Sequence, residues 1–271
     1  MNTFLEFAMY LANNLKRYIL NNIDNFIFST KNKLYLNPSD GDINIVFLTG
    51  NQGKYKEFLT CYNVFKESLN DGDDKEKKIK ITHMKVDLDE IQSTSNEEVL
   101  DYKMNLFLKT YPHLLYKPNT FYILEDTGLY IKDINDFPGA LIKFYLNSLG
   151  CEGIASKHSG SQARSLTYVG IIPPNCRPQK IYFSVQGSIV NSQGANGFGY
   201  DSIFNPIGVD SKLKSSYPYP DLLKEDEQNG IIPFKDIQEN ETYADLDNEK
   251  KIFYSPRSIC FYNLFKRLYA S

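Results

Sequence analysis

The stretch INIVFLTGNQGK, residues 43–54, decides how the rest of the chain is organised. Residues 43–48 form a nearly continuous apolar run, which is typical of a strand buried on both faces of a sheet. Two glycines, Gly50 and Gly53, follow, and a helical pattern of apolar residues begins at Tyr55. The stretch therefore predicts a buried strand, a tight loop and a helix that starts at the loop.

This loop suits a polyphosphate. Its glycines let the backbone present N–H groups, and the following helix directs its positive end to the same place. Lys54 adds a mobile cation. The spacing differs from the Walker pattern GxxxxGK[ST], because the glycines are too close together and Tyr55 follows the lysine. An ordinary strand–helix turn with a surface lysine is the alternative interpretation.

Two acidic segments lie further along the chain. DLDEIQ, residues 87–92, is either a solvated loop or a source of Mg²⁺ ligands, because hard cations take oxygen ligands. Lys103, one predicted helix later, can face the same pocket. EDTG, residues 125–128, follows the apolar run 121–124, and we expect it at the end of that strand, where open α/β sheets bind ligands. A metal would offset the cost of these adjacent carboxylates and activate water, whereas the alternative is a capped turn.

Two later segments carry groups that suit a nucleotide. GANGFGYD, residues 194–201, allows close backbone approach, and Phe198 or Tyr200 can stack on a base, which is typically worth ~1–3 kcal/mol. The alternative is a glycine-rich loop whose aromatic side chains belong to the core. Near the C-terminus, Lys251 and the segment 255–257, Ser-Pro-Arg, offer good donors to a base or a phosphate.

The remaining patterns predict the fold class. Strands are expected at 79–86, 165–172 and 181–190, the last two as antiparallel neighbours, and helices at 97–108, 138–149 and 251–269. Pro138 and Gly150 would mark the two ends of the middle helix. Because strands and helices are interleaved, the class is α/β or α+β with a mixed sheet.

The sequence patterns indicate one main domain, residues 43–271, with additions, and the resemblance described below implies that this domain is catalytic. Residues 1–42 are expected to form an N-terminal extension with an amphipathic helix, and a targeting segment is disfavoured by Glu6 and Asp24. The catalytic domain would span 43–271, with surface insertions near 70–78 and 208–240, of which the second is polar and punctuated by prolines.

Composition excludes several classes of protein. The 271 residues include 30 Lys and Arg against 33 Asp and Glu, so the net charge of −3 argues against binding a nucleic acid polymer. No run approaches the ~18 consecutive apolar residues of a membrane span. The four cysteines form no CxxC pair and suit a reducing compartment, so a cytoplasmic location is expected. The three histidines show no HExxH spacing.

Taken in order, these segments resemble the inosine triphosphate pyrophosphatase family, which hydrolyses noncanonical purine nucleoside triphosphates. The matching segments are TGN..K at 49–54, DLDEIQ at 87–92, EDTGL at 125–129, FPGALIKFYL at 137–146, GFGYD at 197–201 and TYADL…SPR at 242–257. The resemblance covers about residues 43–207 and 241–271. It implies an elongated, two-lobed α/β fold with a central mixed β-sheet flanked by helices and a cleft between the lobes, usually as a homodimer. It further implies Mg²⁺-dependent cleavage, with Mn²⁺ as a substitute, of ITP, dITP and XTP between the α and β phosphates, releasing the nucleoside monophosphate and pyrophosphate.

The resemblance also implies residue roles. Asp126 would activate water beside Glu125, and Glu90 and Asp126 would bind the metal. The substrate contacts would be Thr49, Asn51, Lys54, Lys103, Thr127, Phe198, Tyr200, Asp201, Lys251, Ser255 and Arg257.

One departure concerns base selection. The family usually has Ser-His-Arg where this chain has Ser255-Pro256-Arg257, and its histidine helps to recognise a 6-oxo purine. Proline has neither a side-chain donor nor a backbone N–H, so selection against adenine depends on backbone groups and Arg257. Two alternatives stay open. One is a pyrophosphatase for other modified nucleotides. The other is a nucleotide-binding protein without turnover, which the retained Lys54, Glu90 and Asp126 disfavour.

Overall fold

The computed structural model describes residues 42–69, 79–86, 88–174 and 177–270. The predicted N-terminal extension, apart from its last residue, and the predicted insertion at 70–78 lie outside the described residues. None of the described helices is long and apolar enough to cross a membrane.

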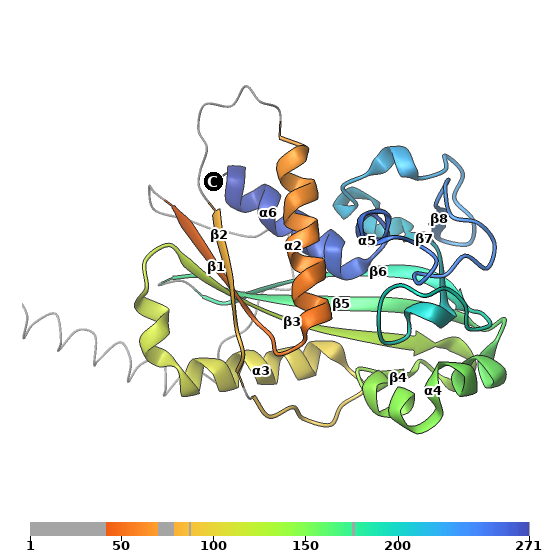
Figure 1. Ribbon diagram of the computed structural model, residues 1–271, viewed down its shortest axis with the longest axis horizontal. Coiled ribbons are helices and arrows are strands. Elements are labelled where there is room, and N and C mark those ends of the chain that lie inside the picture. Colours follow the sequence, from red (N-terminus) through yellow and green to blue (C-terminus); the bar gives the residue numbers. More distant parts are fainter. Residues whose placement is uncertain (1–41, 70–78, 87, 175–176, 271) are drawn as a thin grey trace, which may run out of the picture.

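The described strands form one mixed sheet, as the interleaved pattern predicts (Figure 1). The strands are β1 (Ile43–Leu48), β2 (Ile79–Met84), β3 (Thr120–Ile131), β4 (Phe137–Gly139), β5 (Gln162–Ile172), β6 (Gln179–Ile189), β7 (Phe204–Asp210) and β8 (Ile231–Pro233). Their order is β2-β1-β3-β5-β6-β7-β8, and β4 pairs with β3. β1 is parallel to β2 and β3, and the other pairs are antiparallel.

Helices cover both faces of this sheet. They are α2 (Gln52–Glu67), α3 (Asn96–Thr110), α4 (Ile142–His158), α5 (Asn248–Ile252) and α6 (Pro256–Ala270). Shorter 3₁₀ turns occupy Pro112–Tyr116, Lys132–Ile134, Asp201–Ile203, Ser211–Ser216 and Pro220–Leu222. Figure 1 shows α2 and α6 on one face and α3 on the other. The α/β class is confirmed, and the division into two lobes stays a prediction.

The hydrophobic core is divided into two clusters, one on each face of β3. Phe121 and Ile123 join the larger apolar cluster, which includes side chains of α2 and α6, whereas Tyr122 and Leu124 join the smaller cluster with α3. Successive side chains of a strand point to opposite faces, so this alternation divides the core. The same alternation decides where the polar residues that follow Leu124 point.

The expected end of a strand at residue 124 is wrong. β3 continues to Ile131, so the segment 125–128 lies inside the strand. The parallel pairing of β3 with β1 stops at Ile123, and from Tyr122 onward β3 pairs antiparallel with β5. The polar residues therefore stand just beyond the carboxyl end of the parallel pair, which is the ligand-binding position, but on continuous strand.

Two helix predictions also need correction. Pro138 lies in β4, and α4 begins only at Ile142. Gly150, with φ +66°, interrupts that helix, which then resumes to His158. The predicted C-terminal helix is two helices, because α5 ends at Ile252 and α6 begins at Pro256, where proline suits a first helical position.

The segment 208–240 is more than a surface insertion. Its strand β8 extends the sheet beyond β7, and Leu213, Tyr217, Leu223 and Phe234 are buried in the larger cluster. Short strands and turns interrupted by prolines leave little periodicity, so the sequence pattern does not reveal this packing.

Candidate active site

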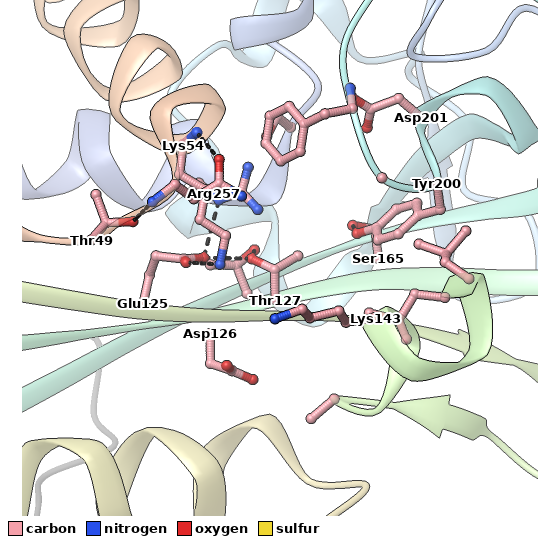
Figure 2. A pocket seen from close by; sticks show the side chains of 18 of the residues that line it. Thr49, Lys54, Glu125, Asp126, Thr127, Lys143, Ser165, Tyr200, Asp201 and Arg257 are labelled. Carbon is pink, nitrogen blue, oxygen red and sulfur yellow. Dashed lines mark hydrogen bonds and ion pairs between the residues drawn. The ribbon is translucent and has the colours of Figure 1, made fainter. Parts of the chain in front are cut away.

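A pocket of about 680 Å³ opens where the parallel part of the sheet ends (Figure 2). Its lining includes every residue that the sequence predicts for the site: Thr49, Asn51, Lys54, Glu90, Lys103, Glu125, Asp126, Thr127, Phe198, Tyr200, Asp201, Lys251, Ser255 and Arg257. The lining also includes Lys143, Ser165, Thr167, Tyr243 and Pro256. Segments from distant parts of the chain therefore meet in one cavity.

The TGNQGK loop, residues 49–54, is shaped by its own side chains. Asn51 caps α2, and its amide oxygen accepts from the backbone N–H of Lys54 at 3.1 Å. The hydroxyl oxygen of Thr49 accepts from the backbone N–H of Asn51, also at 3.1 Å. These bonds hold the loop at the positive end of α2, which is a suitable place for an anion.

Glu125 points from β3 toward α2 and α6. Figure 2 shows its carboxylate with Lys54 and Arg257 on one side of the strand. Arg257 Nε lies 3.1 Å from Oε2, and the Thr127 hydroxyl donates to the same oxygen at 2.8 Å. Burial alone would raise the pKa of Glu125, but the charges of Lys54 and Arg257 hold that pKa well below its usual value. Glu125 is thus a fixed anion that anchors two cations.

Asp126 points the other way, toward α3. The side-chain amide of Asn96 donates to Oδ2, and Lys103 Nζ lies 3.4 Å from Oδ1. Burial raises the pKa of Asp126, and the charges of Lys103 and Lys54 only partly oppose that effect. Two adjacent carboxylates therefore have opposite pKa shifts.

The same face has a donor set that fits a hard cation. Lys103 Nζ lies between Glu90 Oε1, at 3.0 Å, and Asp126 Oδ1, so two carboxylates converge on one positive group. Half of the Glu90 side chain is exposed. Among the described residues, no three His, Cys, Asp or Glu side chains form a metal-binding group. One or two carboxylates with substrate phosphates are the usual Mg²⁺ environment, so the pair fits magnesium.

The aromatic loop, residues 194–201, uses its two rings differently. Phe198 is half-buried at the pocket, with Lys251 Nζ 5.1 Å from its ring centroid. Tyr200 is buried, and its hydroxyl lies 2.7 Å from Ser165 Oγ. Asp201 accepts from the backbone N–H of Phe198 at 2.7 Å and pairs with Lys251 at 2.6 Å. Phe198 is therefore the ring placed to meet a ligand, while Asp201 shapes the loop.

The buried acid Glu57 was not predicted. It lies on α2, one turn beyond the TGNQGK loop, and accepts from Ser255 at 2.6 Å, Arg257 at 2.6 Å and Ser258 at 2.8 Å. Burial alone would raise the pKa of Glu57, but Arg257, Lys251 and the two hydroxyls lower it to about 2. An acidic residue in an amphipathic helix usually faces solvent. The only sign in the sequence that Glu57 is buried is that it lies next to Phe58, on the apolar side of α2.

Asn96 and Lys143 were also missed. Asn96 is completely buried at the start of α3, where it contacts Asp126. Figure 2 shows Lys143, from the first turn of α4, extending into the pocket. Lys143 lies within the matched segment 137–146 but has no predicted role there, and Asn96 belongs to none of the matched segments, so the folded chain reveals their positions.

Comparison with known proteins supports a common origin. The chain is 31% identical over 174 residues to a dITP/XTP pyrophosphatase of Methanopyrus kandleri, covering 62% of this chain and 81% of that protein. It is 32% identical over 170 residues to an inosine triphosphate pyrophosphatase of Scheffersomyces stipitis, covering 61% and 82%. A HAM1 protein structure from Coxiella burnetii shares the fold, with a TM-score of 0.51 and 19% identity over 84% of this chain and 100% of that one. Residues 45–215 match the Ham1 family, and the chain belongs to that family.

Proposed function

We propose that this protein hydrolyses noncanonical purine nucleoside triphosphates, namely ITP, dITP and XTP, to the nucleoside monophosphate and pyrophosphate. The observation that carries the proposal is one pocket in which cations and carboxylates from distant segments meet. Glu125 anchors Lys54 and Arg257, and its neighbour Asp126 meets Lys103 and Glu90 in the same pocket. The names of the relatives from Methanopyrus kandleri and Scheffersomyces stipitis agree with this substrate class.

The cations of the pocket support binding of a triphosphate. Phosphoryl transfer depends mainly on positioning and charge neutralisation, which suits a cavity lined by Lys54, Lys103 and Lys143 together with Arg257. Lys54 is held beside the loop by Glu125, and its side chain keeps about a quarter of its surface exposed. In the proposal, these groups and the N–H groups of the TGNQGK loop hold the three phosphates.

Mg²⁺, with Mn²⁺ as a substitute, is the proposed cofactor. Glu90 and Asp126 would hold the ion, and it would supply charge neutralisation and activation of water. Asp126 would accept a proton from the attacking water at Oδ1, the oxygen that faces Lys103.

Base recognition is assigned to the aromatic loop and the C-terminal segment. Phe198 offers a ring face, and Lys251, Ser255 and Arg257 line the wall beside it. Pro256 also lines the pocket and has no donor to offer. We therefore propose that the Arg257 region and backbone groups choose the base.

We also propose that the protein is a homodimer and is located in the cytoplasm. The dimer follows from the family resemblance. The location is proposed from the cysteine pattern, and the free thiols of Cys61, Cys151 and Cys260 agree with a reducing compartment.

The reaction itself is tested by identifying products. Purified protein with ITP and Mg²⁺ is expected to yield IMP and pyrophosphate, followed by ³¹P NMR, and omission of Mg²⁺ should stop the reaction. Release of IDP and inorganic phosphate would contradict the proposed bond cleavage. ITP binding without any product, in the presence of Mg²⁺, would favour the nucleotide-binding alternative.

A further inference from the structure

We propose that Asn96 and Tyr130 form a positioning pair that fixes the Asp126 carboxylate for the reaction. The inference rests on the proposed function, in which Asp126 acts on the attacking water. Tyr130 is on β3, four residues beyond Asp126, and Asn96 is the first residue of α3. Neither residue lines the pocket, so both would act through Asp126.

The contacts form a chain of directed hydrogen bonds. The Tyr130 hydroxyl donates to the Asn96 side-chain oxygen at 2.6 Å, and the Asn96 side-chain nitrogen donates to Asp126 Oδ2. The backbone N–H of Asn96 also reaches the Tyr130 hydroxyl oxygen, at 3.4 Å. Asn96 is fully buried and Tyr130 is 8% exposed, so water competes little for these bonds.

The carboxylate and the tyrosine together select one orientation of the amide. An asparagine side chain has an acceptor oxygen and a donor NH₂, and an ionised carboxylate accepts only, so the NH₂ group faces Asp126. The amide oxygen is left to accept the Tyr130 hydroxyl at 2.6 Å, which is shorter than the 3.2 Å contact of that hydroxyl with the Thr94 carbonyl. Tyr130 thus completes the hydrogen bonding of Asn96 in the orientation that serves Asp126.

Helix α3 delivers two groups to the two oxygens of one carboxylate. Asn96 and Lys103 are seven residues apart, which is close to two helical turns, so they share a face of the helix. Asn96 takes Oδ2, and Lys103 lies 3.4 Å from Oδ1. The carboxylate plane is therefore fixed from both sides, with Oδ1 left beside Lys103 and Glu90.

The surroundings are built around this pair. A Cβ on residue 128 would lie 2.3 Å from the Asn96 side-chain oxygen, so Gly128 makes room for the amide. On the outer side, the Arg164 guanidinium carbon lies 4.3 Å from the centroid of the Tyr130 ring. Such a cation contact stabilises the ring in place.

The test is a double-mutant cycle with Asn96→Ala and Tyr130→Phe. Asn96→Ala should lower kcat for ITP by about 10–100-fold with KM within about twofold, as loss of an orienting partner does. Tyr130→Phe should lower kcat by about fivefold, because it removes the short bond to the Asn96 amide oxygen together with the longer contacts to the Thr94 carbonyl and the Asn96 backbone N–H. The double variant should be no slower than Asn96→Ala, because the hydroxyl acts only through the amide.

Two control variants separate positioning from stability. Ser95→Ala removes the cap of the same helix, where Ser95 Oγ accepts from the backbone N–H of Glu98 at 3.3 Å, without touching Asp126. Tyr217→Phe removes an equivalent hydroxyl, bonded to the Phe253 carbonyl at 3.0 Å, outside the pocket. Both should lower Tm and leave kcat unchanged. Equal kcat losses in the controls, or unchanged kcat in Tyr130→Phe, would overturn the inference.

A second readout does not depend on turnover. In ¹⁵N-labelled, metal-free protein, the side-chain amide signal of Asn96 is identified by its loss in Asn96→Ala. Its protons should exchange slowly with water, and Tyr130→Phe should remove that protection. Fast exchange in the unchanged protein would contradict the pair. If the unchanged protein shows slow exchange but releases no pyrophosphate, the result would contradict the proposed function and leave the Asn96–Tyr130 pair intact.

Discussion

At the scale of single residues, the backbone geometry separates two carboxylates that are adjacent in sequence. Glu125 and Asp126 point to opposite faces of β3, so they meet different partners and have opposite pKa shifts. The sequence predicts that both belong to the site, because acidic residues followed an apolar run. It does not separate their roles, since the cations come from helices distant in sequence.

Replacing Asp126 tests its proposed role directly. Asp126→Asn keeps the shape of the side chain but removes the group that accepts a proton, so kcat for ITP should fall by about 10²–10⁴-fold. Substrate binding, measured by calorimetry with the variant, should persist. Asp221→Asn, on an exposed turn outside the pocket, is the matched control and should behave as the unchanged protein. Near-normal kcat in Asp126→Asn would remove it as the proton acceptor.

Lys54 is expected to act through substrate binding. Lys54→Ala removes a cation that lines the pocket, and KM for ITP should rise by about tenfold, the effect of losing a charge-assisted hydrogen bond. Lys56→Ala is the matched control, because Lys56 lies on the same helix but is exposed. Steady-state kinetics compare the two variants, and equal KM values would contradict the assignment.

Glu57 makes the stability of the fold depend on pH. Its pKa is lowered from 4.5 to about 2 in the folded protein, so its ionised form stabilises the fold above about pH 4.5. That contribution, on the order of 3 kcal/mol, is lost as the pH falls from 4.5 toward 2. Melting temperatures across this range should therefore fall steeply in the unchanged protein.

Glu57→Gln supplies the comparison. The variant should melt at lower temperature at neutral pH, because Arg257 loses a buried partner, and its melting temperature should change less steeply below pH 4.5. Identical slopes for the two proteins would show that Glu57 is not the titrating group.

At the scale of secondary structure, the sequence patterns predict elements better than their ends. The apolar run at 43–48 and the helical period after it are uninterrupted, and β1 and α2 form as predicted. Glu125 and Asp126 interrupt the apolar pattern of β3, so the pattern ends at Leu124, seven residues before Ile131, the end of the strand. Such a strand is possible because lysine and arginine side chains from three helices neutralise the carboxylates. Those contacts form only in the folded chain, so the local sequence pattern does not reveal them.

Gly128 is the position at which β3 depends most on close packing. A Cβ there would lie 2.3 Å from the Asn96 side chain and 2.7 Å from the backbone of Gly139 in β4. Gly128→Ala should therefore destabilise the protein by about 1–3 kcal/mol, measured by urea unfolding, and also lower kcat. Gly50→Ala is a matched control for stability, because its Cβ would meet only the flexible side chain of Lys85 at 3.5 Å. Equal stability of the two variants would contradict this packing.

At the scale of the whole molecule, the nearly balanced overall charge does not reveal that charged side chains gather in one pocket. The net charge of −3 hides a pocket in which lysines and arginine face carboxylates. The chain has no tryptophan, and the aromatic side chains that line the pocket are Phe198, Tyr200 and Tyr243. The position of the pocket follows from the sheet, because the parallel pairing of β1 and β3 ends there and the strand that carries the carboxylates continues.

The most direct test of the central claim is pyrophosphate release from a panel of nucleotides with Mg²⁺. The proposed function predicts kcat/KM for ITP, dITP and XTP well above the values for GTP and ATP, with pyrophosphate as the product. No release from any nucleotide would contradict the proposed activity. Equal kcat/KM for ATP and ITP would contradict the proposed base selection and show that this protein, with Pro256 in its pocket, does not discriminate against adenine.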